Sequence, residues 1–170
     1  MRRGTGSFYK RGMRILGIDP GYGRLGVAII DAEKGKKEIL VHSECFETSA
    51  KMPHAERLNS VKEKIKKTID EFSPGAVGIE SLLFSKNKKT AFGVAEARGV
   101  ILSEIAGCKI PITEFGPGQI KIAVTGHGGS DKNHVRKMIE IILGKSFDSA
   151  KDDECDAVAV AIALAAIGRF

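Results

Sequence analysis

The sequence contains little cysteine. Its three cysteines, Cys45, Cys108 and Cys155, lie far apart and form no C-x-x-C pair. This spacing argues against a disulfide framework or a cysteine-ligated zinc site, and it fits reduced thiols in a cytosol better. The sequence therefore predicts a cytoplasmic protein without structural disulfides.

Long apolar runs are also missing. The best candidate, residues 157–167, is short and rich in alanine, so a buried helix is expected there and no membrane contact. Residues 1–12 are basic and glycine-rich and lack the apolar stretch of a signal peptide. We predict a flexible N-terminal extension over residues 1–13 and one domain over residues 14–170, without an internal repeat.

Acidic residues are outnumbered by basic ones. The 170 residues include 27 Lys and Arg against 21 Asp and Glu, which gives a formal net charge of +6. A basic balance hints at an anionic partner such as nucleic acid, and it carries no information about the fold. The length is sufficient for one domain with a buried core and too short for two large lobes.

The pattern of apolar residues predicts the order of the elements. Strands are expected at residues 14–19, 24–31, 38–46, 76–80 and 110–114. Helices are expected at residues 53–72, 90–106, 133–143 and 153–167, with a short helix after Gly116 and Gly118. Three hairpin-linked strands followed by alternating helices and strands predict an α/β fold with a mixed five-stranded sheet and helices on both faces.

A glycine-rich stretch follows the first strand. Gly21, Gly23 and Gly26 fit the G-x-G-x-x-G template of a dinucleotide-binding loop, and Asp19 precedes them. That template requires a helix after the glycines, whereas residues 27–30 favour a strand and lead into a turn. Asp19 would also repel incoming phosphates unless a cation lay between them. The stretch therefore favours a hairpin, whose glycines allow a tight turn and the close approach of a phosphate backbone.

Acidic residues stand where a sheet could bring them together. Asp19 and Glu80 each end an apolar strand. Three more, Asp152, Asp153 and Asp156, open the last helix. Residues three or four apart share a helix face, so either Asp152 or Asp153 could join Asp156 in one site. Asp152 also suits the N-cap of that helix, where an acidic side chain is electrostatically favourable.

A divalent metal is the partner that such a cluster favours. Buried carboxylates are costly alone, and several together repel one another, which raises their pKa values. A divalent ion reverses that penalty, and all-oxygen ligands favour Mg²⁺, with Mn²⁺ able to substitute. Two such ions per subunit, about 3.5–4 Å apart, would activate a water and stabilise the leaving oxygen of a phosphodiester. The residues alone therefore predict metal-dependent hydrolysis of a nucleic-acid backbone.

Four segments carry a family resemblance through their order and spacing. They are RILGIDPGYGRLGVAIID, VGIESLLFSKNKKTAFGVAEARGVIL, FGPGQIKIAVTGHGGSDKNHV and DECDAVAVAIALA. Together they resemble the signature segments of the RuvC Holliday-junction resolvases over about residues 14–166. The resemblance implies a ribonuclease H-like fold, a homodimer and Mg²⁺-dependent paired nicking of four-way DNA junctions in recombination and repair. It also implies action alongside the RuvA–RuvB branch-migration complex.

The resemblance further implies which residues form the site. It identifies four acidic residues as metal ligands and catalytic residues, namely Asp19, Glu80, Asp153 and Asp156. It places the family's DNA-contacting lysines at Lys121 and Lys132, which composition alone would leave as ordinary surface residues. For AEARGVIL, residues 95–102, it implies the dimer interface, whereas the residues alone indicate core packing.

One position departs from the family pattern. The family often has an aromatic residue, used against junction bases, at the position of Leu83, and here the aromatic is the next residue, Phe84. Stacking by Phe84, wedging by Leu83 and simple packing of either residue are all compatible with the sequence. Three lysines just beyond them suit DNA phosphate contacts, namely Lys86, Lys88 and Lys89.

Other functions are compatible with parts of the sequence. A related nuclease that acts on RNA or RNA–DNA hybrids would use the same acids and lysines. A DNA-binding module without catalysis gains nothing from carboxylates that face phosphates. An actin-like ATPase, suggested by the strand–Asp–Gly opening, needs a second lobe for which the chain is too short. His127 could contact DNA or a water near the metal, although a lone loop histidine is usually incidental.

Overall fold

The computed structural model describes residues 12–81 and 88–168, and in the second range it describes side chains from residue 91 onward. Residues 1–11 of the expected N-terminal extension lie outside these ranges. Leu83, Phe84 and Lys86 lie outside them as well, and Lys88 and Lys89 are described only by their backbone.

Five strands form one mixed sheet, as predicted. They are β1 (Met13–Asp19), β2 (Arg24–Ala32), β3 (Ile39–Glu47), β4 (Ala76–Glu80) and β5 (Ile112–Phe115). Their order across the sheet is β3-β2-β1-β4-β5. The first three strands pair antiparallel, whereas β4 pairs parallel with both β1 and β5. The predicted strand bounds are therefore correct to within one or two residues.

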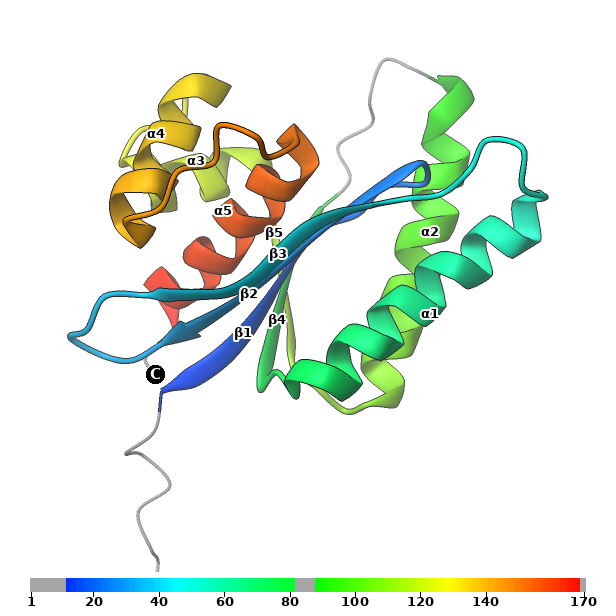
Figure 1. Cartoon of the computed structure of the whole chain (residues 1–170), viewed down its shortest axis with the longest axis horizontal. Helices are drawn as coiled ribbons and strands as arrows, with labels where there is room; N and C mark the ends of the chain where they lie inside the picture. Colours follow the sequence, from blue (N-terminus) through cyan, green and yellow to red (C-terminus); the bar gives the residue numbers. More distant parts are fainter. Residues whose placement is uncertain (1–11, 82–87, 169–170) are drawn as a thin grey trace, which may run out of the picture.

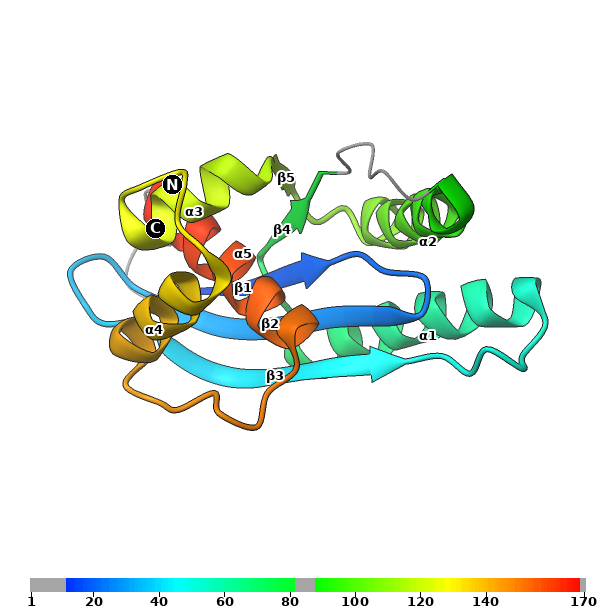
Figure 2. The same ribbon diagram turned by 90° about the horizontal axis from the view of Figure 1, so that it is seen from above.

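Helices cover both faces of the sheet, which confirms the predicted α/β architecture (Figure 1). They are α1 (His54–Phe72), α2 (Lys88–Gly107), α3 (Pro117–Thr125), α4 (Lys132–Leu143) and α5 (Asp152–Ile167). One face packs against α1 and α2, and the other packs against α5, with α3 and α4 beside it (Figure 2). Within the described residues, no helix combines the length and apolar character needed to cross a bilayer.

Alternation along β1 decides which way its terminal acid points. Leu16 and Ile18 are fully buried against α1 and α2, whereas Ile15 belongs to the core around α5. Because successive side chains of a strand point to opposite faces, Asp19 lies on the α5 face. The residues of β4 alternate in the same way, so Glu80 lies on that face too. The hydrophobic cores on the two opposite faces of the sheet thus determine the direction in which both strand-terminal carboxylates point.

Glycines in β1 and β2 bring α5 close to the sheet. A Cβ added to Gly17 would lie 2.3 Å from the carbonyl oxygen of Ala157. One added to Gly26 would lie 1.9 Å from the carbonyl oxygen of Asp153. Real Cβ atoms essentially never come this close to another heavy atom. The first turns of α5 therefore sit directly over the ends of β1 and β2.

The glycine-rich stretch forms the predicted hairpin. β1 and β2 pair antiparallel until Asp19 lies opposite Gly26. Gly21 allows the tight turn, because a Cβ there would lie 1.7 Å from the carbonyl oxygen of Arg24. The expectation that these glycines leave space for a phosphate backbone is wrong at Gly26, because α5 fills that space.

The start of α5 also differs from the expectation. Its N-cap residue is Lys151, and Asp152 is already the first helical residue. The N-cap role expected of Asp152 is therefore wrong. Its charge still lies in the first turn, where the helix dipole favours acidic side chains.

Candidate active site

Asp19 and Glu80 lie side by side at the ends of two neighbouring parallel strands. β1 and β4 are in register up to Ile18 and Ile79, and the next residue of each strand is one of these acids. Their carboxyl groups interact directly, and this interaction contributes to the raised pKa of Asp19. Because like charges repel, the arrangement disfavours the ionisation of both groups at once.

The first turns of α5 contribute two more carboxylates, Asp153 and Asp156, which lie three residues apart on one helix face. Both repel the charge of Asp19, as does Glu80. The structure therefore brings together the four acids singled out from the sequence. We call Asp19, Glu80, Asp153 and Asp156 the carboxylate tetrad.

Burial and mutual repulsion raise the pKa values of this tetrad. Burial, together with repulsion by the other three acids, raises the pKa of Asp19 to about 8. Burial also raises the pKa of Glu80, with a contribution from Asp156. The pKa of Asp156 is raised mainly by burial, although Lys132 opposes this shift. The site thus disfavours its own full ionisation in the absence of a cation.

Cations of the protein face the two helix-borne acids. Lys132 Nζ lies 3.4 Å from Asp156 Oδ2, and Arg24 Nη1 lies 3.7 Å from Asp153 Oδ2. Asp156 and Asp152 raise the pKa of Lys132, despite the opposing effect of its burial. Each of these two carboxylates therefore has a positive partner other than a metal.

The donor set suits a hard divalent cation. In the described part of the chain, no three His, Cys, Asp or Glu side chains lie in a geometry that could already hold an ion. Asp19 and Glu80 interact with each other, and the other two tetrad acids face basic side chains. The chemistry still fits, because four carboxylates supply oxygen donors and concentrate negative charge that a divalent cation would relieve.

The two predicted DNA-binding lysines lie beside the tetrad. Lys121 on α3 and Lys132 on α4 line a cavity of about 260 Å³ together with Glu80 and Asp156. Both lysines stabilise the ionised form of Glu80 and so oppose the rise of its pKa. This cavity, which we call the lysine cavity, places two cations beside two of the acids.

Strand β3 holds the start of α5 through Ser43 and Cys45, for which the sequence indicated no place in the site. Ser43 donates a hydrogen bond of 2.6 Å to Glu154, and Cys45 Sγ lies 3.9 Å from Asp153 Oδ2. Both side chains point to the α5 face, because they are two residues apart on one strand. Their even spacing in the sequence indicates a shared face, but not which helix lies over it.

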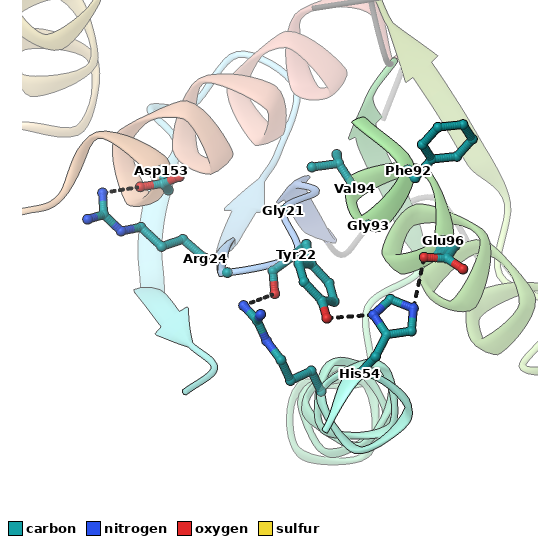
Figure 3. Close-up of a pocket in the computed structure, with 11 residues that line it drawn as sticks. Gly21, Tyr22, Arg24, His54, Phe92, Gly93, Val94, Glu96 and Asp153 are labelled. Carbon is teal, nitrogen blue, oxygen red and sulfur yellow. Dashed lines mark hydrogen bonds and ion pairs between the residues drawn. The ribbon is translucent and has the colours of Figure 1, made fainter. Parts of the chain in front are cut away.

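Asp153 lines a second cavity, of about 620 Å³ (Figure 3). The turn between β1 and β2 and the starts of α1 and α2 form its walls. Tyr22 Oη lies 2.5 Å from His54 Nδ1, and His54 Nε2 lies 2.9 Å from the carboxylate of Glu96. We call this the hairpin cavity, and the sequence analysis did not identify it.

Two other acidic or basic candidates lie outside the tetrad. Asp152 is largely exposed and pairs with Lys132 and Arg136 at 3.4 and 3.3 Å. His127 accepts a hydrogen bond of 3.2 Å from the Gly129 N–H of its own loop. Neither side chain takes part in the contacts among the tetrad carboxylates.

Comparisons with known proteins agree on one family. The family model described as crossover junction endodeoxyribonuclease RuvC matches residues 15–164. The RuvC protein of Thermosipho melanesiensis is 42% identical over 158 residues, which span 93% of this chain and all of that protein. The RuvC protein of Desulfitobacterium hafniense is 40% identical over 150 residues, which span 88% of this chain and 90% of that protein.

Solved structures show the same relationship. Thermus thermophilus RuvC superimposes with a TM-score of 0.82 at 32% identity, over 91% of this chain and 94% of that one. The same protein in complex with a Holliday junction substrate gives a TM-score of 0.84 at 31% identity, over 90% and 93% of the two chains. The yeast mitochondrial Holliday junction resolvase shares the fold, with a TM-score of 0.70 at 13% identity. With its sheet, its tetrad and these relatives in agreement, the chain belongs to the RuvC family and is a crossover junction endodeoxyribonuclease.

Proposed function

We propose that the chain resolves Holliday junctions by hydrolysing DNA phosphodiester bonds at the carboxylate tetrad, as part of homologous recombination and DNA repair. The observation that carries this proposal is the meeting of four acids from three elements beside two lysines. Its relative from Thermus thermophilus, which spans nearly the same length, is described in complex with a Holliday junction substrate. The substrate therefore follows from the family, and the chemistry follows from the site.

We propose that Asp19, Glu80, Asp153 and Asp156 bind Mg²⁺, with two ions in each subunit and Mn²⁺ able to replace them. Nucleases of the RuvC family are metal-dependent. When bound, the metal would activate a water and stabilise the charge that develops on the leaving oxygen. The raised pKa of Asp19 supports this assignment, because a cation is what would allow all four acids to ionise together.

Lys121 and Lys132 are proposed to hold the scissile phosphate. Both line the lysine cavity at the edge of the tetrad, and a phosphate there would meet two positive charges before it met the acids. Lys132 already neutralises Asp156, which reduces the repulsion that an incoming phosphate would encounter. We also propose contacts with junction bases or phosphates for five residues whose side chains the structure does not describe, namely Leu83, Phe84, Lys86, Lys88 and Lys89.

We propose a homodimer built on α2, because one active site in each subunit can cut two symmetry-related strands of a four-way junction. Ala97 and Ile101 pack in the core, which confirms the predicted packing role for one face of residues 95–102. The other face carries small exposed residues such as Ala95 and Gly99, which permit close approach of a second helix. Cooperation with RuvA and RuvB in the cytoplasm is proposed from the family resemblance.

A synthetic four-way junction tests this function. The purified protein is expected to introduce paired nicks in Mg²⁺ or Mn²⁺, and Asp19→Asn is expected to bind the junction without cutting it. An RNA–DNA hybrid offered in competition distinguishes a junction resolvase from a hybrid nuclease of the same fold. Failure to cut any branched DNA with either metal would refute the proposal.

A further inference from the structure

Two cavities flank the carboxylate tetrad. Glu80 and Asp156 line the lysine cavity, whereas Asp153 lines the hairpin cavity. A DNA strand with one phosphate at the tetrad has a further phosphate and nucleotide on each side of it. Tetrad carboxylates therefore line both cavities, and the hairpin cavity is available to the DNA strand beside the scissile phosphate.

The walls of the hairpin cavity are held in place by polar contacts. Tyr22 at the tip of the β1–β2 turn connects through His54 to Glu96, and so joins the turn to α1 and α2 (Figure 3). The guanidinium of Arg57 lies 3.8 Å from the centre of the Tyr22 ring and donates a hydrogen bond of 3.0 Å to Thr48. These contacts hold the turn that follows Asp19, so the cavity is pre-formed in the protein.

Arg24 lies at the boundary between the hairpin cavity and the tetrad. Its side chain is 60% exposed and forms two long ion pairs, at 3.3 Å with Glu47 and at 3.7 Å with Asp153. Exposed ion pairs of this kind contribute little stability and are easily exchanged. Glu47 also has a second partner, because Lys151 Nζ lies 2.5 Å from its carboxylate. Arg24 is therefore held only by weak, exposed ion pairs, and its planar guanidinium suits a phosphate.

We propose that the hairpin cavity is a nucleotide subsite for the cleaved DNA strand, in which Arg24 exchanges Asp153 for the phosphate next to the scissile one. The inference rests on the proposed function and names a contact beyond the two lysines. With a divalent cation held by the tetrad, Asp153 would be shared with that cation. Arg24 would then be free to take the DNA phosphate as its new partner. The positive charge of Arg24 would thus stay between the hairpin cavity and the tetrad, while its partner changes from Asp153 to a DNA phosphate.

The salt dependence of junction binding tests this exchange. Each phosphate contact contributes about one unit to the slope of log affinity against log salt concentration. In Ca²⁺, which takes the same oxygen donors, Arg24→Ala is expected to make this negative slope shallower by about one unit relative to the unmodified protein. In EDTA, where Arg24 stays with Asp153, the two slopes are expected to be equal. A denaturing gel confirms that the junction is still uncut after each titration.

Control variants separate this contact from a general loss of charge or structure. Lys36→Ala removes a cation at the far end of the sheet, where Lys36 pairs with Glu33, and is expected to leave the slope unchanged. Arg24→Lys keeps the charge and is expected to restore most of the slope. Equal slopes for Arg24→Ala and the unmodified protein in Ca²⁺ would overturn the subsite. A loss of the same size in EDTA would overturn the exchange with Asp153. Junction cleavage by the unmodified protein in Mg²⁺ upholds the proposed function whatever Arg24→Ala does.

Discussion

The backbone of Gly26 touches the backbone of Asp153, so tightly that a Cβ on the glycine would lie 1.9 Å from the carbonyl oxygen of the aspartate. This contact fixes the height of α5 above β2, and with it the positions of two tetrad carboxylates. The G-x-G-x-x-G pattern therefore has a packing function at its last glycine. It supports the helix that carries Asp153 and Asp156 rather than a nucleotide.

Gly26→Ala is expected to displace the start of α5 and to remove most of the nuclease activity. Overpacking of this kind costs about 1–3 kcal/mol, and Tm falls by about 2–4 °C for each kcal/mol in a chain of this size. A displacement of about 1 Å at a catalytic group is sufficient to reduce the rate about 10²-fold. Gly118→Ala is the matched control, because no atom lies within 4 Å of its added Cβ. Full activity in Gly26→Ala would show that α5 tolerates displacement.

Asp19→Asn is expected to make the stability of the metal-free protein less sensitive to rising pH. Burial and repulsion by the other acids raise the pKa of Asp19 to about 8 in the folded state. The pKa of an aspartate in the unfolded chain is about 3.9. Between these values the folded state retains a proton that the unfolded chain has lost, so stability falls as pH rises towards 8. Thermal melts in EDTA from pH 5 to 8 should show this fall in the unmodified protein and a smaller one in the variant. Asp70→Asn, on the exposed surface of α1, should behave like the unmodified protein.

Mg²⁺ is expected to stabilise the folded protein at pH 8. A ligand that binds only the folded state at 100 times its Kd adds about 2.7 kcal/mol. Mn²⁺ should act in the same way, and Glu80→Gln should lose most of the gain. Glu154→Gln is the control from the same cluster of acids, because Glu154 bonds to Ser43 and lies outside the tetrad. An unchanged Tm in the unmodified protein across a wide Mg²⁺ titration would contradict the proposed metal site.

Much of the site could be predicted from the sequence because strands alternate in a regular way. Asp19 and Glu80 each follow an apolar run, and the register of β1 with β4 places them together. The choice between Asp152 and Asp153 could not be made from spacing, because both are compatible with the Asp156 face. The family resemblance favoured Asp153, and the close contact of α5 with Gly26 places this residue over the sheet.

Other parts of the site depend on contacts between segments far apart in the chain. Cys45 and Asp153 are separated by 108 positions, and no local pattern in either segment indicates the other. In the sequence, Arg24 is an ordinary polar residue at the start of a strand, and only the position of α5 shows that it pairs with Asp153. The hairpin cavity likewise combines a turn with the starts of two helices, so its existence required the three-dimensional structure.

Asp153→Asn and Asp152→Asn are expected to differ sharply, although each removes one charge from adjacent positions. Loss of a metal-orienting residue typically costs 10–100-fold, and loss of a ligand costs more, so Asp153→Asn should reduce junction cleavage by at least about 10²-fold. Asp152 is largely exposed and pairs with Lys132 and Arg136, so Asp152→Asn should retain most activity. Single-turnover cleavage of a junction in Mg²⁺ measures both. Equal losses in the two variants would mean that negative charge at the start of α5 matters more than its position.

Lys132→Ala is expected to slow cleavage more than it weakens folding. Lys132 Nζ lies 3.4 Å from Asp156 and lines the lysine cavity, so its loss removes a cation both from the acid and from the proposed scissile phosphate. Removal of one pre-positioned group that stabilises transition-state charge costs about 10²-fold in rate. Lys132→Arg should recover part of the rate, and Lys137→Ala, an exposed lysine of the same helix, should leave it unchanged. Single-turnover rates and thermal melts on the same samples separate the two effects, because a folding defect would lower Tm in proportion to the loss of activity. A Lys132→Ala variant that cuts junctions at the unmodified rate would remove this lysine from the site.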